Sequence, residues 1–276
     1  MEIERRALMK WKAFAVALAV VLVGIGAVAI PRGTGAPAAK PEALNRLDQV
    51  VQRGELRVCS TGDYRPYTYR DAAGAWSGID IDMAHDLAGK LGVRAVIVPT
   101  TWKTLMRDFE AKCDIAVGGV SITLERAKQA FFSRAYAVDG KTPITRCENA
   151  ERFQTLEQID RPGVRVIVNP GGTNEQFARA NLRQATIVEH PDNNTIFEQI
   201  VAGNADLMMT DAAETKWQAK QHPELCSVHP DQPFTFAEKA YLVPRGDVVF
   251  QQYVDQWLNL ALHDGTYDRI SGPWIG

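Results

Sequence analysis

The sequence lacks the residue patterns that several common functions require. Its 276 residues contain four cysteines and five histidines, none spaced as metal-ligand pairs, so we expect no metal site. No serine–histidine–aspartate or cysteine–histidine set is evident, which leaves covalent hydrolysis without support. Basic and acidic residues nearly balance, at 31 and 33. Without a basic face the chain is a poor nucleic-acid binder, and we expect no nucleic-acid partner.

Long apolar runs are scarce, and the clearest one stands at the N-terminus. Four basic residues precede an uncharged apolar run over residues 13–30, and a stretch rich in Gly, Ala and Pro follows up to residue 41. This order is typical of an export signal, although the run is close to the ~18 residues that a membrane span needs. We therefore expect residues 1–40 to be an export signal, or an uncleaved membrane anchor, with a linker. Removal of residues 1–29 changes the formal charge from −2 to −4, so the exported part is mildly acidic. Because of the export signal we expect it in the periplasm.

Beyond this leader, segments with helical and strand patterns alternate. A first series has helices expected at 44–52, 81–91, 102–111 and from 124, and strands at 55–59, 94–98 and 114–120. A second series has helices near 156, from 174, at 195–202 and from 211, and strands at 165–168, 186–188 and 207–210. Helices of ten to fifteen residues between strands indicate parallel βαβ units. A helical tail at 249–262 and beyond completes the pattern.

Each series is too short to be a large fold alone, which favours an α/β fold of two lobes. We expect residues 44–140 and 238–276 to form the first lobe and residues 141–237 the second. The chain then crosses between the lobes twice, near 139–145 and 235–243. In such folds the ligand lies in the cleft between the lobes, at the carboxyl ends of strands.

The four cysteines divide into two pairs. Cys147 and Cys226 flank the second α/β series, and export makes a disulfide chemically reasonable, so we expect a bridge that closes this unit. Cys59 and Cys113 lie in apolar runs, and we interpret them as buried free thiols.

Two loops of the first lobe hold candidate ligand residues, each with a structural alternative. Residues 61–67 place Asp63, Tyr64 and a second tyrosine after the first strand, where the rings cover a flat ligand or simply pack in a turn. Residues 118–126 bring glycines, a serine and Arg126 together, and a guanidinium suits a ligand carboxylate. The alternative is that Thr123 caps the following helix and Arg126 is a solvated surface residue.

A Gly-rich turn over residues 169–176 joins a strand to a helix in the second lobe. Free N–H groups at a helix start attract anions, but the turn lacks the lysine of a nucleotide-binding loop. Thr173 and Gln176 also fit a capping box, which is compatible with a bound carboxylate.

Two acids, Asp211 and Glu214, end the apolar run over residues 207–210. At the mouth of a helix they could bind a ligand or donate a proton. An acid followed three residues later by Glu is itself a capping box, and the spacing alone favours the cap.

Taken in order, these motifs resemble the periplasmic amino-acid-binding proteins of ABC transporters over about residues 44–276. The likeness lies in residues 119–123 with Arg126, the turn at 172–173, and the tail at 264–267 with Trp274. It implies that Arg126 and Thr173 hold a ligand carboxylate, Tyr64 and Trp102 line the pocket, and Asp211 meets an amino group. The remaining candidate substrate-binding residues come from the three loops: Asp63, Gly119, Ser121 and Asn169.

Longer segments, concentrated in the second lobe, resemble the cyclohexadienyl dehydratase family. They are residues 139–145, 153–160, 168–175, 206–211 and 236–241, together with Cys147 and Cys226. Members of that family combine the solute-binding fold with catalysis on prephenate and arogenate. The family's catalytic acid stands three residues after the aspartate of the motif, which places it at Glu214.

The resemblance implies a reaction that needs neither cofactor nor metal. Loss of water and CO2 turns prephenate into phenylpyruvate and arogenate into phenylalanine, and the ring becomes aromatic. The site must hold a small dicarboxylate and protonate the departing hydroxyl. We expect Glu214 to be this general acid, with its pKa raised above ~4.3 by burial and nearby carboxylates. The alternative is a non-catalytic periplasmic amino-acid-binding protein, which needs Asp211 but not Glu214.

Overall fold

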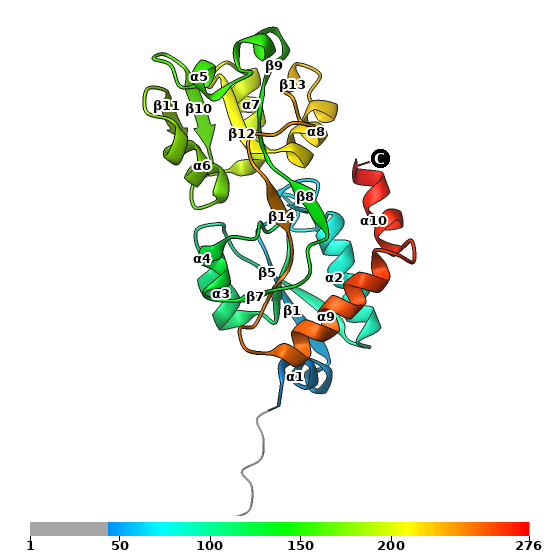
Figure 1. The fold of residues 1–276 in the computed structure, drawn as a ribbon. Coiled ribbons are helices and arrows are strands. Elements are labelled where there is room, and N and C mark those ends of the chain that lie inside the picture. The colour runs from blue at the N-terminus through cyan, green and yellow to red at the C-terminus, as the bar shows by residue number, and fades with distance from the viewer. Residues whose placement is uncertain (1–43, 276) are drawn as a thin grey trace, which may run out of the picture. The chain divides into compact units, whose positions relative to one another are not determined.

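The computed structural model describes residues 44–275, and the expected leader lies outside this range. The described residues belong to one compact unit with two large sheets, which a two-stranded sheet connects (Figure 1). Within residues 44–275, no helix is long and apolar enough to cross a membrane.

The first lobe is built on a five-stranded sheet. In spatial order its strands are β5 (Arg94–Pro99), β1 (Glu55–Ser60), β6 (Ile115–Ala116), β15 (Leu242–Val243) and β7 (Phe131–Phe132). The helices of this lobe are α1 (Arg46–Arg53), α2 (Ile79–Lys90), α3 (Leu105–Lys112), α4 (Leu124–Ala127), α9 (Val248–Ala261) and α10 (Thr266–Ile275). A small sheet holds β2 (Asp63–Tyr64), β3 (Thr68–Arg70) and β4 (Trp76–Ser77). Strand β1 runs parallel to β5 and β6, as the βαβ pattern predicts.

Helical periodicity explains how this lobe closes over its sheet. Helix α2 buries Ile79, Met83 and Leu87 completely, at the four-residue spacing that keeps side chains on one face. Helix α9 adds Phe250 and Val254 to the same core. The C-terminal tail therefore returns to the first lobe, and its predicted helix is confirmed.

The second lobe has a five-stranded sheet of mixed direction. In spatial order its strands are β11 (Thr186–Glu189), β10 (Arg165–Val168), β12 (Leu207–Asp211), β9 (Lys141–Arg146) and β13 (Leu225–Ser227). The α-helices are α5 (Leu156–Ile159), α6 (Thr173–Asn181), α7 (Ile196–Val201) and α8 (Ala212–Gln221), and the 3-10 helices are η1 (Cys147–Arg152) and η2 (Asn193–Thr195). Strand β10 is parallel to β11 and β12. Strand β9, which the sequence pattern did not predict, runs antiparallel to β12 and β13.

Separate hydrophobic cores support the two lobes. Val166, Val168, Leu207 and Met209 belong to a core of the second lobe that includes no residue of the first. Between the lobes, β8 (Ala137–Asp139) pairs antiparallel with β14 (Ala237–Lys239), and the two strands run side by side in Figure 1. The expected lobe boundaries at 140/141 and 237/238 fall at this pair and stay a prediction.

Both pairs of cysteines form disulfides. The predicted Cys147–Cys226 bridge is confirmed. The interpretation of Cys59 and Cys113 as free thiols is wrong, because they are bonded to each other with Cα atoms 5.7 Å apart. Cys59 lies on β1, and Cys113 follows α3 just before β6. Strand β6 pairs with β1, and its Ala116 lies opposite Cys59. Adjacent parallel strands thus bring together cysteines that are 54 residues apart in sequence.

One predicted strand is much shorter than expected. The apolar run over 114–120 is extended only at Ile115–Ala116. Gly118 and Gly119 have φ angles of 120° and 68°, which only glycine adopts without strain. The chain therefore leaves the sheet here and forms a loop that reaches the site.

Candidate functional site

The site is centred on Asp211, a fully enclosed carboxylate at the end of β12. Its Oδ1 accepts a hydrogen bond from Lys141 Nζ at 2.7 Å, and its Oδ2 accepts one from Lys239 Nζ at 2.5 Å. All three side chains are at least 95% buried. Lys141 opens β9 and Lys239 ends β14, so both ammonium groups come from the segments where the chain crosses between the lobes.

The remaining donors of these lysines connect the loops of both lobes. Lys141 Nζ also donates to Thr173 Oγ1 at 3.0 Å and to Asn174 Oδ1 at 2.5 Å. Lys239 Nζ also donates to Ser121 Oγ at 2.9 Å. The Tyr64 hydroxyl donates to Asp211 as well. Side chains from β2, from the loop after β6 and from the start of α6 are thereby fixed around one carboxylate.

The electrostatics of the cluster favour charged forms at its centre. Burial alone would raise the pKa of Asp211, but the ammonium groups of Lys141 and Lys239 outweigh burial and hold this pKa well below its usual range. Burial lowers the pKa of Lys141, against the attraction of Asp211. Two ammonium groups share one carboxylate, so the cluster retains a positive charge.

Arg126 adds a third cation beside this cluster. Thr123 caps α4 as the structural alternative predicted, because its side chain accepts from the N–H of Arg126. Arg126 is not a solvated surface residue, however: it is 9% exposed, and its Nη1 donates to the Ser121 carbonyl at 2.9 Å. Burial lowers its pKa to about 10, so the guanidinium stays charged at neutral pH. Its carbon Cζ lies 5.8 Å from the centroid of the Trp102 ring.

The turn before α6 does not form the expected capping box. Gly172 is the N-cap residue and Thr173 is already the first residue of the helix, so the Thr173 hydroxyl is available to accept from Lys141 instead. The neighbouring Gly171, at φ 93°, approaches the backbone of Lys103 in the first lobe so closely that a Cβ atom would lie 2.6 Å from it. This turn therefore needs glycine where the two lobes meet.

Asp211 and Glu214 do not form a capping box either. Asp211 is the N-cap residue of α8, but its side chain caps no N–H group because both oxygens accept from lysines. Glu214 is 1% exposed, and its Oε2 accepts from Thr210 Oγ1 at 2.5 Å. Thr210 accepts in turn from Asn174. The second oxygen of Glu214, Oε1, is buried and accepts no hydrogen bond from any described residue.

This environment keeps Glu214 protonated. Burial raises its pKa to about 8, and the charge of Asp211 adds to the rise, while the hydrogen bond from Thr210 opposes it. The site thus holds two carboxyl groups three residues apart in opposite states at neutral pH. Asp211 is ionised and Glu214 is neutral, which is the arrangement that separates an electrostatic role from an acid role.

A small cavity of about 20 Å³ lies between the lobes at this cluster, with room for about one water molecule. Seven predicted site residues line it: Tyr64, Trp102, Gly119, Ser121, Asn169, Thr173 and Asp211. Three other predicted site residues do not line it: Asp63, Arg126 and Glu214. Asp63 accepts from Trp102 Nε1 at 3.0 Å, and burial raises its pKa.

Sequence reasoning missed several residues of the site. Lys141, Lys239, Asn174 and Asn193 all contact or line it. The two lysines had a detectable signal, since each is a charged residue at the border of an apolar segment near an expected crossing. The two asparagines had no such sequence signal, because Asn is common in turns and at the starts of helices. Among residues 44–275, no group of His, Cys, Asp and Glu is placed to hold a metal ion.

The fold and the site identify the class of protein. Residues 56–276 match the model of the bacterial extracellular solute-binding proteins, family 3, and the chain belongs to this family. The two-lobed α/β fold predicted from the sequence is thereby confirmed.

Within this family, the chain is 59% identical to the cyclohexadienyl dehydratase of Pseudomonas aeruginosa over 232 residues, which cover 84% of this chain and 86% of the relative. It is 26% identical to the L-cystine-binding protein TcyJ of Escherichia coli, covering 92% and 94%. Among solved structures, an ancestral amino acid-binding protein described as a precursor of cyclohexadienyl dehydratase has a TM-score of 0.77 at 35% identity, covering 83% of this chain and 99% of the other. An ancestral cyclohexadienyl dehydratase has a TM-score of 0.54 at 51% identity, covering 85% and 98%.

Proposed function

We infer that the chain is an exported cyclohexadienyl dehydratase that converts prephenate into phenylpyruvate and arogenate into phenylalanine. Two things support this function together. One is the 59% identity to a dehydratase over most of both chains. The other, which carries the mechanism, is the buried and neutral carboxyl of Glu214 beside the cationic cluster.

The charges of the cluster suit a dicarboxylate substrate. Lys141, Lys239 and Arg126 are three cations against the single ionised Asp211. The excess positive charge is buried, where an anion interacts with it more strongly than in water. We propose that Arg126, Thr173 and the N–H groups at the start of α6 hold the carboxylates, while Tyr64 and Trp102 pack against the ring.

Glu214 then acts as the general acid. Its proton goes to the ring hydroxyl as the C–O bond breaks and water leaves. The C–C bond to the ring carboxylate breaks with it, CO2 departs, and the electron pair of that bond completes the aromatic ring. Glu214 is left as a carboxylate and takes a new proton from solvent. The unpartnered Oε1 is the oxygen that we assign to the substrate hydroxyl.

The geometry is less suited to an amino-acid receptor. In that role Asp211 would meet the α-amino group of the ligand, but both of its oxygens already accept from lysines. Glu214 would also serve no purpose as a buried, uncharged acid. Because lysines of the protein already occupy both oxygens of Asp211, the site favours a dehydratase over an amino-acid receptor.

The decisive assay follows prephenate consumption and phenylpyruvate formation by purified protein. We expect Glu214→Gln to lower kcat by about 10²–10⁴-fold, which is the usual value of general acid catalysis. Glu110→Gln, at an exposed position of α3, is the matched control and should keep full activity. If the wild-type protein binds amino acids tightly and leaves prephenate unchanged, the proposed dehydratase function is wrong. Full activity in Glu214→Gln would overturn only the assignment of the acid.

We further propose that residues 1–40 direct the chain to the periplasm, in keeping with a family of extracellular proteins. The mass of the protein recovered from a periplasmic extract tests this step. A mass lower than that of the full chain indicates cleavage of the leader, whereas recovery of the protein in the cytoplasm would contradict export.

A further inference from the structure

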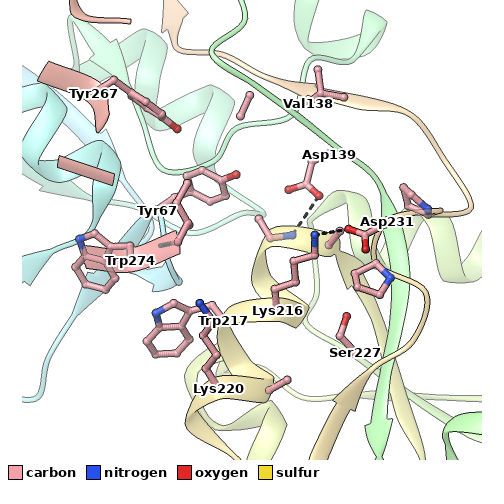
Figure 2. Close-up of a pocket in the computed structure, with 17 residues that line it drawn as sticks. Tyr67, Val138, Asp139, Lys216, Trp217, Lys220, Ser227, Asp231, Tyr267 and Trp274 are labelled. Carbon is pink, nitrogen blue, oxygen red and sulfur yellow. Dashed lines mark hydrogen bonds and ion pairs between the residues drawn. The ribbon is translucent and has the colours of Figure 1, made fainter. Parts of the chain in front are cut away.

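A second cavity between the lobes is far larger than the one at Asp211. Its volume is about 700 Å³, within the range of small-molecule sites. No described residue lines both cavities. The first lobe contributes Tyr67, Asp139, Tyr267 and Trp274, and α8 of the second lobe contributes Trp217. Figure 2 shows Asp139 and these four aromatic rings around the same space.

Asp139 gives this cavity an unsatisfied acceptor. Its Oδ1 accepts from the N–H groups of Gly140 and Ala213, at 2.9 and 3.3 Å. Its Oδ2 is buried and accepts nothing among residues 44–275, although the residue is only 7% exposed. A buried acceptor without a donor is costly and uncommon. Burial raises the pKa of Asp139, and the charge of Asp211 adds to the rise.

The cations near Asp139 do not supply the missing hydrogen bond. Lys216 lines the cavity, but its Nζ donates to Asp231 Oδ1, at 2.6 Å. Lys239 lowers the pKa of Asp139 through its charge, yet its Nζ donates to Ser121, Asp211 and Tyr64. The oxygen without a donor therefore belongs to a residue that lines the cavity.

The aromatic residues that line the cavity indicate which other chemical groups a ligand would carry. The rings of Trp217 and Trp274 meet across the two lobes, with centroids 6.5 Å apart. Tyr67 and Tyr267 line the same space. Aromatic faces attract organic cations and pack against apolar groups. A carboxyl group surrounded by such rings is suited to an amine.

We propose that this cavity is a second binding site, for a small organic cation with an apolar body. The ligand ammonium donates to Asp139 Oδ2, and its apolar or aromatic part packs against Trp217, Tyr267 and Trp274. Anions such as the dehydratase substrates should bind more weakly, because they would lie beside the buried carboxyl of Asp139, although Lys216 and Lys220 also line the cavity. The site is thus distinct from the cationic site at Asp211, and its occupant contacts both lobes.

Isothermal titration with three probes of similar size tests the charge of the ligand. Phenethylamine should bind saturably at one site per chain. In competition titrations, uncharged 2-phenylethanol and anionic 3-phenylpropionate should displace phenethylamine about tenfold less effectively or worse than a second aromatic amine does, because neither can donate a charged hydrogen bond to Asp139. Absence of saturable phenethylamine binding, or equal binding of all three probes, would overturn the proposal.

Substitutions of residues that line the cavity test whether phenethylamine binds there. Asp139→Asn and Trp274→Ala should each weaken phenethylamine binding by about tenfold. Leu260→Ala, at an exposed position of α9, is the control and should bind as the wild type does. Glu214→Gln should also bind normally, which separates this site from the dehydratase site. Should Asp139→Asn fail to fold, Trp274→Ala carries the test alone. Unchanged affinity in the folded variants would contradict the assignment.

Discussion

Three charged side chains, Asp211, Lys141 and Lys239, form a buried cluster that links the lobes and that we propose as the anion site. Asp211 is held by Lys141 and Lys239, which come from different crossing segments. Buried ions are stable only when they are paired and hydrogen-bonded. Each member therefore depends on the others, but not to the same degree, because two cations share one anion.

This asymmetry predicts unequal effects of substitution. Asp211→Asn leaves two buried ammonium groups without a counter-ion and should destabilise the protein by about 3–5 kcal/mol. Lys239→Met leaves the Lys141–Asp211 pair intact and should cost clearly less, about 1–3 kcal/mol. Urea unfolding of both variants and the wild type measures the difference. Equal losses, or a larger loss in Lys239→Met, would show that the two lysines do not share the charge of Asp211.

The raised pKa of a single residue, Glu214, leads us to predict a pH dependence of activity. As the proposed general acid it must be protonated, and its pKa is raised to about 8. Activity should therefore be maintained below pH 8 and fall about tenfold per pH unit well above it. The profile of kcat/KM against pH for prephenate measures this limb. A profile that is flat up to pH 10 would remove Glu214 from the acid role.

The same shift has a consequence for stability. In the unfolded chain this carboxyl has its ordinary pKa of about 4.5, whereas in the folded protein its pKa is about 8. The unfolded state thus holds fewer protons in this window, and Glu214 lowers stability progressively as pH rises through it. In Glu214→Gln this part of the pH dependence should disappear, which urea unfolding at several pH values detects.

At the scale of elements, the strand-to-helix turns determine what reaches the site. The loop after β6 brings Gly119 against the rings of Tyr64 and Tyr67, where an added Cβ would lie 2.5 and 2.6 Å from ring carbons. Gly92 has the same φ of 68° but has no atom within 4 Å of such a Cβ. The two glycines differ only in what surrounds them, which makes them a matched pair.

Alanine at each position separates backbone strain from crowding. Gly92→Ala should cost about 1–2 kcal/mol for a left-handed residue. Gly119→Ala should cost a further ~1–3 kcal/mol from overpacking and should lower kcat/KM, because Tyr64 lines the cavity and bonds Asp211. Urea unfolding and steady-state kinetics measure the two effects. If both variants keep full activity, the close approach of Gly119 to Tyr64 does not matter for the site.

Most elements could be predicted from sequence because their periodicity is local. Helix α2 and the parallel strands β1, β5 and β10 follow directly from their patterns. Strand β9 could not be recognised, because it is buried on both faces and has a proline in its middle, so it lacks alternation. The Cys59–Cys113 bridge and the pairing of Lys141 with Lys239 through Asp211 depend on which segments become neighbours. Such contacts are set by topology, which no local pattern encodes.

At the scale of the whole molecule, access to the site requires movement of the lobes. The cavity at Asp211 has a volume of about 20 Å³, which is room for about one water molecule and far too small for a ring with two carboxylates. Asn193 of the second lobe donates to the backbone carbonyl of Asp63 in the first lobe at 2.7 Å. A ligand can therefore enter only if such contacts break and the lobes separate about β8 and β14.

This movement should be visible in solution scattering. Glu214→Gln is expected to bind prephenate without converting it, so the variant traps the bound state. Its radius of gyration should decrease when prephenate is added, because the ligand draws both lobes around the cationic cluster. The same variant without prephenate, measured at the same protein concentration, serves as the control. An unchanged radius at saturating prephenate would mean that the substrate enters through side-chain movement alone, with the two lobes fixed.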